Sequence, residues 1–243
     1  MNRIKIKRRQ LYICWCITWF TFILLLIYPI SYGAIRLATV LSGIIIWAGA
    51  IFLFWSQKAM RFFLISLTLI ISLFLISPSR PTDVSYFRDN YVQALKSYSG
   101  IRYVWGGENQ LGIDCSGLVR QGLIRVNLVQ GITSLNPGLV RKGLELWWYD
   151  TSAESLRDGY RNLTIRLLSS NSINELDYTK ISKGDMAVTT DGKHILAYLG
   201  EKTWIEADPG YKKVIEVKIP ELNNYWFTIP VYALRWKQLV IGH

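Results

Sequence analysis

The chain has 243 residues, of which 28 are Lys or Arg and 17 are Asp or Glu, giving a formal net charge of +11. Residues 1–80 hold nine of the basic residues and none of the acidic ones, so residues 81–243 carry 19 basic against 17 acidic residues. The excess positive charge therefore lies beside apolar segments, where it orients insertion into a membrane. This distribution argues against a nucleic-acid partner.

Three apolar stretches occupy the first third of the chain: Leu11–Tyr28, Leu37–Trp55 and Phe62–Ser77. A helix needs about 20 apolar residues to cross a bilayer, with about 17 as the lower limit. The first two stretches meet this length, whereas the third needs its flanking residues to do so. No small-x-small cleavage site follows the first stretch closely, and further apolar segments come directly after it. The sequence therefore favours three retained membrane helices over a signal peptide.

The basic residues of the short connections predict the orientation of these helices. Five basic residues precede the first stretch, Lys58 and Arg61 lie between the second and third, and Arg36 stands alone in the first connection. Basic residues favour the cytoplasmic side. This places residues from about 78 onward on the periplasmic or extracellular side of the cell (inner) membrane. If the third stretch does not cross, the following domain is cytoplasmic instead.

Cys115 is the only cysteine after residue 80 and begins a predicted helix. Cys14 and Cys16 lie inside the first apolar stretch, where we expect them to act as small apolar residues, with lipidation as the alternative. Cys115 follows Asp114, a favourable N-cap residue. The thiolate is the nucleophilic form of cysteine, and a helix N-terminus stabilises it. The sequence therefore predicts a catalytic nucleophile at this position.

Residues 81–243 are sufficient for one domain with its own core. Pro78–Pro81 predicts a stiff connector, followed by a helix that is capped by Thr82 or Asp83 and ends at Gly100. A second helix is expected from Cys115 to about Val126. Five short strands are expected after Gly184, at Met186–Thr190, His194–Gly200, Lys202–Asp208, Val214–Ile219 and Trp226–Trp236. Helices followed by an antiparallel sheet predict an α+β domain.

His194 is the candidate base for the Cys115 thiol. The chain has two histidines, and His243 is the last residue, where an incidental role is expected. A cysteine nucleophile needs a base, and that base needs a group that holds its tautomer. If the strands on either side of residue 200 form a tight hairpin, Glu206 faces His194 directly. Asp208 takes that place if the turn is longer, and a solvated glutamate on an edge strand is the alternative for Glu206.

Three blocks of sequence carry a family resemblance. They are Tyr103-x-Trp105-Gly106-Gly107, then Asp114-Cys115-Ser116-Gly117-Leu118-Val119, then Lys183-Gly184-Asp185 leading into His194-x-x-x-Tyr198-Leu199-Gly200. Over about residues 85–210 the chain resembles the NlpC family of papain-like cell-wall cysteine peptidases. The resemblance implies a helix-borne cysteine packed on a small antiparallel sheet. It also implies hydrolysis of peptide bonds in peptidoglycan stem peptides, commonly the bond between D-glutamate and the diamino acid.

The resemblance also implies roles for single residues. Cys115 is the nucleophile, its backbone N–H contributes to the oxyanion hole, His194 is the general base and later the acid, and Glu206 occupies the third place. An acid there departs from the histidine, asparagine or glutamine that is more usual in the family. The implied substrate-binding residues are Tyr103, whose hydroxyl lies near the nucleophile, and Asp114 and Ser116, which flank it and bind the free amine of a stem peptide.

The segment of about Asn127–Lys180 is longer than expected for a minimal family member. It contains the aromatic cluster Leu146–Tyr149 and the charged stretch Glu154–Arg161. Such a cluster is typical of a core, with a lid or a wall of the substrate groove as the alternative. No set of Cys, His or carboxylate residues has metal-ligand spacing, so neither a metal nor another cofactor is expected.

The predicted organisation is a membrane region over residues 1–80 and an NlpC-type cysteine hydrolase domain over residues 81–243. The predicted function is that of a membrane-anchored cysteine endopeptidase, with peptidoglycan peptides and the lipid bilayer as its partners. Two alternatives remain open at this point. One is a same-fold amidase or acyltransferase acting on lipid or other acyl substrates, and the other is a non-catalytic membrane adaptor.

Overall fold

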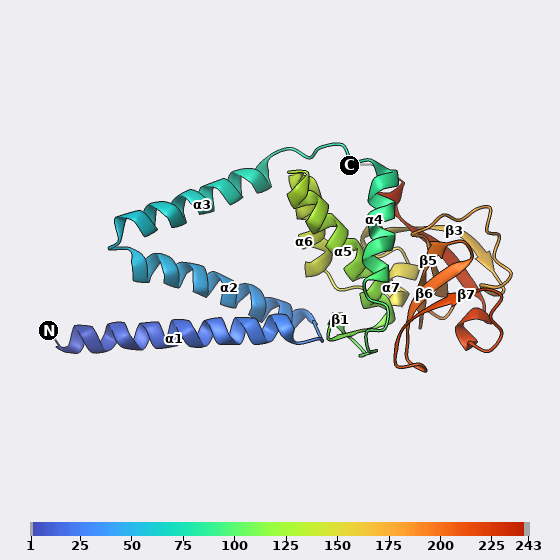
Figure 1. The fold of residues 1–243 in the computed structure, drawn as a ribbon, viewed down its shortest axis with the longest axis horizontal. Coiled ribbons are helices and arrows are strands. Elements are labelled where there is room, and N and C mark those ends of the chain that lie inside the picture. The colour runs from blue at the N-terminus through green and yellow to red at the C-terminus, as the bar shows by residue number, and fades with distance from the viewer. Residues whose placement is uncertain (1, 241–243) are drawn as a thin grey trace.

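The computed structural model describes residues 2–240, and side-chain surroundings from residue 8 onward. Three long helices, α1 (Asn2–Ile27), α2 (Gly33–Phe54) and α3 (Lys58–Ile76), extend away from the rest of the chain (Figure 1). Each contains a segment long and apolar enough to cross a membrane, which in α1 is Arg8–Ile27. The third segment has 19 residues because the helix begins at Lys58, before the apolar run itself.

The three helices run back and forth between two ends of the molecule. The start of α1 and the α2–α3 connection lie at the end remote from the sheet, and the α1–α2 connection lies beside the rest of the chain (Figure 1). The indole of Trp15 donates to the Ile46 carbonyl at 3.0 Å, and the indole of Trp47 donates to the Thr68 hydroxyl at 3.1 Å. These contacts join α1 to α2 and α2 to α3.

After the three long helices, four α-helices precede the first strand of the main sheet in the described part of the chain. In α4 (Val84–Lys96), the predicted cap is confirmed, because the Asp83 carboxylate accepts the N–H groups of Ser85 and Tyr86 at 2.8 and 3.2 Å. The helix α5 (Cys115–Thr133) runs beyond the predicted end at Val126. Its Gly131 is not a stop signal but leaves room for Val140 of the next helix.

The segment after α5 has more regular structure than the sequence suggested. It forms α6 (Pro137–Trp148), whose N-cap Asn136 accepts the Gly138 N–H at 3.1 Å, and the short α7 (Ala153–Arg157). A strand, β3 (Thr164–Ser170), follows and joins the main sheet. The proline at the first helical position and the Asn cap were usable signals for α6.

The main sheet has six antiparallel strands in the order β3-β8-β4-β5-β6-β7. The expectation of a strand from Trp226 is wrong, because residues Tyr225–Phe227 form a 3₁₀ turn and Pro230, which has no N–H to donate, precedes β8. A second, two-stranded sheet pairs β1 (Glu108–Asn109) with β2 (Gly112–Ile113). The remaining strands of the main sheet are β4 (Met186–Thr189), β5 (Ile195–Gly200), β6 (Thr203–Asp208), β7 (Lys213–Lys218) and β8 (Val231–Trp236).

Every residue of β4 and every residue of β5 except the last is buried. These central strands are therefore covered on both faces of the main sheet. One face packs with α4 and α5 in a core that includes Tyr91, Leu118 and Ile205. The other face carries a second cluster built around Trp204 and Phe227. The domain is therefore α+β, with helices against an antiparallel sheet and three candidate membrane helices before it.

Candidate active site

Cys115 is the first residue of α5, and its side chain is largely buried. The preceding Asp114 caps the helix: its Oδ1 accepts the Gly117 N–H at 2.6 Å and the Ser116 hydroxyl at 3.0 Å. Its other oxygen accepts the Gly106 N–H at 2.8 Å. One carboxylate therefore fixes both the start of the helix and the loop beside it. The thiol consequently lies at the positive end of the helix dipole.

The loop that contains Gly106 and Gly107 runs very close to the first turn of α5. A Cβ atom on Gly117 would overlap the Gly107 carbonyl oxygen, so only glycine fits there without displacing the backbone. Gly106 has a φ of +72°, which also favours glycine. These glycines hold the wall of the site against the helix that carries Cys115.

His194 lies directly before β5 and is 1% exposed. Its Nε2 is 2.6 Å from Oε2 of Glu206, a fully buried residue of β6. The side chain of Cys115 also lies close enough to the ring to raise the pKa of His194. Because Glu206 occupies Nε2, Nδ1 is the ring nitrogen that remains for the sulfur. The structure thus brings the three residues into one buried chain of contacts.

The charges around His194 favour a protonated imidazole. Burial disfavours the charged ring, but hydrogen bonds and negative charge from Cys115 and Glu206 outweigh it and raise the pKa of His194 to about 9. Burial also raises the pKa of Glu206, against the opposing effect of His194 and Asn224. An imidazolium at neutral pH is the partner that stabilises a neighbouring thiolate.

The hairpin that joins β5 to β6 differs from the expected one. Ala197 pairs with Ile205, so the register is two residues away from the one that sets His194 directly opposite Glu206. The turn lies at Glu201 and Lys202, because Gly200 pairs with Thr203, and a bulge between Tyr198 and Gly200 then changes the register by one residue. A shift of two residues keeps each side chain on its face of the sheet, whereas a shift of one reverses it. Glu206 therefore still reaches the imidazole.

Asn224 and Trp226 complete the surroundings of the His194–Glu206 pair. The Asn224 amide donates to Glu206 Oε1 at 2.6 Å and to Asp208 Oδ2 at 3.3 Å. Its own oxygen accepts the Trp226 N–H at 3.0 Å, and the Trp226 ring stacks on the imidazole with centroids 4.2 Å apart. Neither residue was predicted to belong to the site, because this region was expected to form a strand and the loop before it. The asparagine pair at 223–224 was the one available turn signal.

Cys115 opens into a cavity of about 400 Å³. All three residues expected to bind substrate, Tyr103, Asp114 and Ser116, line it, although their binding role stays a prediction. Burial and the negative charges of Cys115, Asp114 and Asp208 raise the pKa of Tyr103, so its hydroxyl remains a neutral donor. Asp114 already accepts three hydrogen bonds, which makes its structural role the better supported one.

The segment of residues 127–180 contributes to both the core and the cavity. Leu146 is buried and Trp147 packs against the main core, which agrees with the core interpretation of this aromatic cluster. Trp148 and Tyr149 are more exposed. The residues that follow, Asp150 to Ala153, line the Cys115 cavity. A groove wall therefore comes from this segment, directly after its aromatic cluster.

Another part of the cavity wall comes from the connection between the first two candidate membrane helices. Ile30, Ser31 and Tyr32 line the cavity together with the exposed Trp105. An isolated antiparallel bridge between Ile30 and Gly107 joins this connection to the loop beside Cys115. From the sequence, this connection was used only to predict the orientation of the membrane helices.

A buried cluster of charges holds that connection in place. The guanidinium of Arg36, in the first turns of α2, lies 2.7 Å from Glu108 and 3.4 Å from Asp150. Arg120 of α5 pairs with the same two carboxylates. Both arginines are 1% exposed. Glu108 is buried as well, whereas the Asp150 side chain is 55% exposed, so the buried part of the cluster is the pairing of the two arginines with Glu108. A buried charge is stable only when it is paired.

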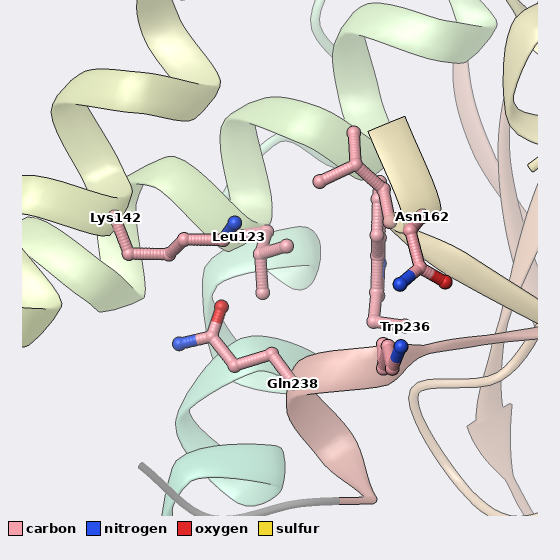
Figure 2. Close-up of a pocket in the computed structure, with 7 residues that line it drawn as sticks. Leu123, Lys142, Asn162, Trp236 and Gln238 are labelled. Carbon is pink, nitrogen blue, oxygen red and sulfur yellow. The ribbon is translucent and has the colours of Figure 1, made fainter. Parts of the chain in front are cut away.

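A second cavity, of about 200 Å³, lies away from Cys115 beside the end of β8 (Figure 2). Leu123, Trp236 and Gln238 line it, with Lys142 at its edge. Among the described residues, its lining includes no thiol, carboxylate or imidazole. Within residues 2–240, no group of three or more His, Cys, Asp or Glu side chains is placed to hold a metal ion.

A cysteine at a helix N-terminus, beside a histidine at the end of an antiparallel strand, is the arrangement of a papain-like cysteine hydrolase. The model of the NlpC/P60 family matches residues 100–235, which is more than half of the chain. The chain belongs to this family of peptidases and other hydrolases.

One curated relative matches about half of the chain. Dipeptidyl-peptidase 6 of Lysinibacillus sphaericus is 28% identical over 128 residues, which are 53% of this chain and 35% of the relative. The chain thus spans about a third of that relative's length.

Similar solved structures include the NlpC1 protein of Trichomonas vaginalis, at 17% identity and a TM-score of 0.40, covering 61% of this chain and 43% of that one. The peptidoglycan hydrolase RipB of Mycobacterium tuberculosis has 19% identity and a TM-score of 0.37, covering 61% of this chain and 65% of that one.

Proposed function

We propose that the chain is a membrane-anchored cysteine endopeptidase that hydrolyses peptide bonds in peptidoglycan stem peptides. The observation that carries the proposal is the buried chain from Cys115 through His194 to Glu206, which opens into the cavity. The similarity to a peptidoglycan hydrolase and to a dipeptidyl-peptidase supports the substrate class. The bond between D-glutamate and the diamino acid is the proposed point of cleavage.

In the proposed mechanism, Cys115, His194 and Glu206 each act in both half-reactions. The Cys115 thiolate attacks the scissile carbonyl carbon, and first-turn N–H groups of α5 stabilise the oxyanion. The His194 imidazolium then donates its proton to the leaving amine as the C–N bond breaks, which leaves a thioester. Next, His194 takes a proton from water, whose oxygen attacks the thioester. The thiolate leaves, and the product is a carboxylic acid. Glu206 holds the ring orientation throughout both steps.

For the remaining residues, we propose that Tyr103 donates its hydroxyl to the substrate near the sulfur. Asp114 and Ser116 receive the free amine of the stem peptide. Asp114 keeps its capping bonds meanwhile, since each carboxylate oxygen can accept more than one hydrogen bond.

We also propose that residues 1–80 anchor the chain by three spans and that residues 81–243 form the hydrolase domain on the periplasmic or extracellular side. The arrangement of the helices supports this. The basic residues Lys58 and Arg61 lie at the same end as the start of α1, and the opposite ends of the helices meet the domain (Figure 1). Positive charge on the cytoplasmic side then directs the domain outward.

The test is the release of soluble fragments from purified cell wall by the full chain in detergent micelles. We expect Cys115→Ala to abolish release and Cys16→Ala, which changes a cysteine of the first candidate span, to leave it unchanged. Equal release by the Cys115→Ala variant and the parent would overturn the proposal. A parallel assay with an acyl lipid identifies the acyltransferase or amidase alternative, which is favoured if only the lipid reacts.

A further inference from the structure

The α1–α2 connection, residues Tyr28 to Tyr32, is built into the loop that borders Cys115. The Glu108 N–H donates to the Pro29 carbonyl at 2.8 Å, and the Ser31 N–H donates to the Gly106 carbonyl at 3.4 Å. The Asn109 amide donates to the Ile27 and Tyr28 carbonyls, both at 3.0 Å. These bonds make the connection an additional strand-like layer of the active-site loop.

The buried charge cluster described above fixes this layer from behind. Arg36 also donates to the Trp148 carbonyl at 3.3 Å and to the Ser31 hydroxyl at 3.3 Å. One side chain of the second candidate span therefore contacts the connection, the α6 end and the Glu108 carboxylate. A charge this deeply paired is expensive to separate. The connection is therefore a fixed wall of the cavity.

A second junction fixes the domain at the end of α3. Arg141 of α6 donates to the Leu75 and Ser77 carbonyls at 2.6 and 2.8 Å and to the Ser79 hydroxyl at 3.0 Å. The two junctions together prevent free rotation of the domain about the membrane helices. The direction in which the cavity faces the bilayer is therefore set by the fold.

The distance from the cavity wall to the bilayer is short. Ile30 is three residues from the end of α1 at Ile27 and three from the start of α2 at Gly33. Three residues span at most about 11 Å, and the headgroup layer is about 6 Å deep on each side of the hydrocarbon core. Tyr28, Tyr32 and Trp105 are exposed around this wall, and Tyr and Trp favour the membrane–water interface. The wall at Ile30 thus lies within about 11 Å of the ends of both candidate spans.

We infer that the enzyme cleaves stem peptides carried on a membrane lipid, with the Tyr28–Tyr32 connection as the wall that receives them at the bilayer surface. This inference rests on the proposed peptidase function and names the physical form of its substrate. A peptide linked to a lipid is confined to the layer in which the cavity opens, so its effective concentration there is far above that of the same peptide in solution.

The experiment uses the full chain in phospholipid vesicles and three forms of one stem peptide. The first form is free in solution, the second is joined to a dialkyl phospholipid by a short linker, and the third is joined by a long flexible linker. All are supplied at equal total concentration. We expect the short-linker form to be cleaved at least as fast as the long-linker form, and about tenfold or more faster than the free peptide.

Two tyrosines provide matched variants. Tyr32→Ala alters the wall and is expected to reduce the preference for the short-linker form several-fold, mainly through KM. Tyr86→Ala removes a similarly exposed tyrosine from α4, away from this cavity, and is expected to leave the preference unchanged. An equal loss in both variants would argue against a specific wall.

The failures of the two proposals are distinguishable. If no form is cleaved faster by the parent chain than by Cys115→Ala, the peptidase function itself is wrong. If the free and long-linker peptides are cleaved but the short-linker peptide resists, the active site lies far from the bilayer and this inference alone is overturned. Equal rates for all three forms would also overturn it.

Discussion

The two sides of the Cys115 cavity are built on different principles. On the sheet side, His194, Glu206, Asn224 and Trp226 form a compact relay of hydrogen bonds and one aromatic stack, all within one region of the chain. On the side of the candidate membrane helices, called the membrane side below, Arg36, Glu108, Arg120 and Asp150 come from four separated segments and meet in a cluster of opposite charges. The sheet side orients a proton donor, whereas the membrane side holds a wall. The two sides are therefore expected to respond differently to substitution, in rate on one and in stability on the other.

The largest effect on the sheet side is expected from Glu206→Gln. An amide keeps the size of the side chain but does not stabilise an imidazolium, and it can hold the wrong tautomer of His194. We expect kcat/KM for a stem peptide to fall by about 100-fold to 10,000-fold. Steady-state kinetics measure the change, and circular dichroism checks that the fold is retained.

Asp208→Asn is the matched control for this prediction. Asp208 accepts the N–H groups of Gly210 and Tyr211 and touches the Asn224 amide, but it makes no hydrogen bond to His194. A loss of less than about tenfold is expected, because the residue acts only through Asn224. If the Asp208 variant lost more activity than the Glu206 variant, Asp208 would be the orienting acid.

The largest effect on the membrane side is expected from Glu108→Gln, which leaves the Arg36 and Arg120 guanidinium groups without their shared buried carboxylate. Removing one partner of a buried ion cluster costs about 3 kcal/mol or more of stability. We expect a lower midpoint of denaturation for the full chain in micelles. The control is Asp89→Asn, which removes an exposed pair with Lys183 worth less than about 1 kcal/mol. Equal midpoints for the two variants would mean that the cluster does not hold the wall.

The same division explains how much of the site was predictable. Cys115 and its Asp114 cap follow from local sequence, since capping acts over a few residues. The choice of Glu206 as the partner of His194 needed a strand register, and the expected register was wrong by two residues. The pairing survived because an even shift preserves the face.

The membrane side was not predictable in this way. Arg36 and Glu108 are separated by more than 70 positions in the sequence, and no periodicity links them. An arginine at the start of an apolar helix indicates that a partner for its charge exists, but the sequence does not identify that partner. Likewise, α6 and β3 fall in a segment that was treated as a single insertion, although Asn136 and Pro137 mark a helix start.

A smaller effect on the sheet side is expected from Asn224→Ala. This change removes the donor to Glu206 Oε1 and the acceptor that positions Trp226, but it leaves the His194–Glu206 contact. We expect kcat/KM to fall about tenfold, as for a positioning residue that loses one hydrogen bond to a charged group. Asn223→Ala, one residue earlier, is the control. A split in which kcat falls and KM is constant would indicate loss of orientation rather than of substrate binding.

The smallest expected effect is on the pH dependence of kcat/KM, which is expected to differ between substitutions on the two sides. The pKa of His194, raised to about 9 from the ordinary 6.5, means that the ring keeps its proton through neutral pH and loses it as the pH rises through about 9. The imidazolium protonates the leaving amine, so kcat/KM should fall to half its plateau near pH 9 and decline further above it. In Glu206→Gln this limb should move to lower pH, because a group that raises the pKa is lost. In Glu108→Gln it should stay in place, since the charge cluster is not among the groups that shift the imidazole. An alkaline limb near pH 6.5 in the parent chain would show that the sheet side does not hold the ring protonated.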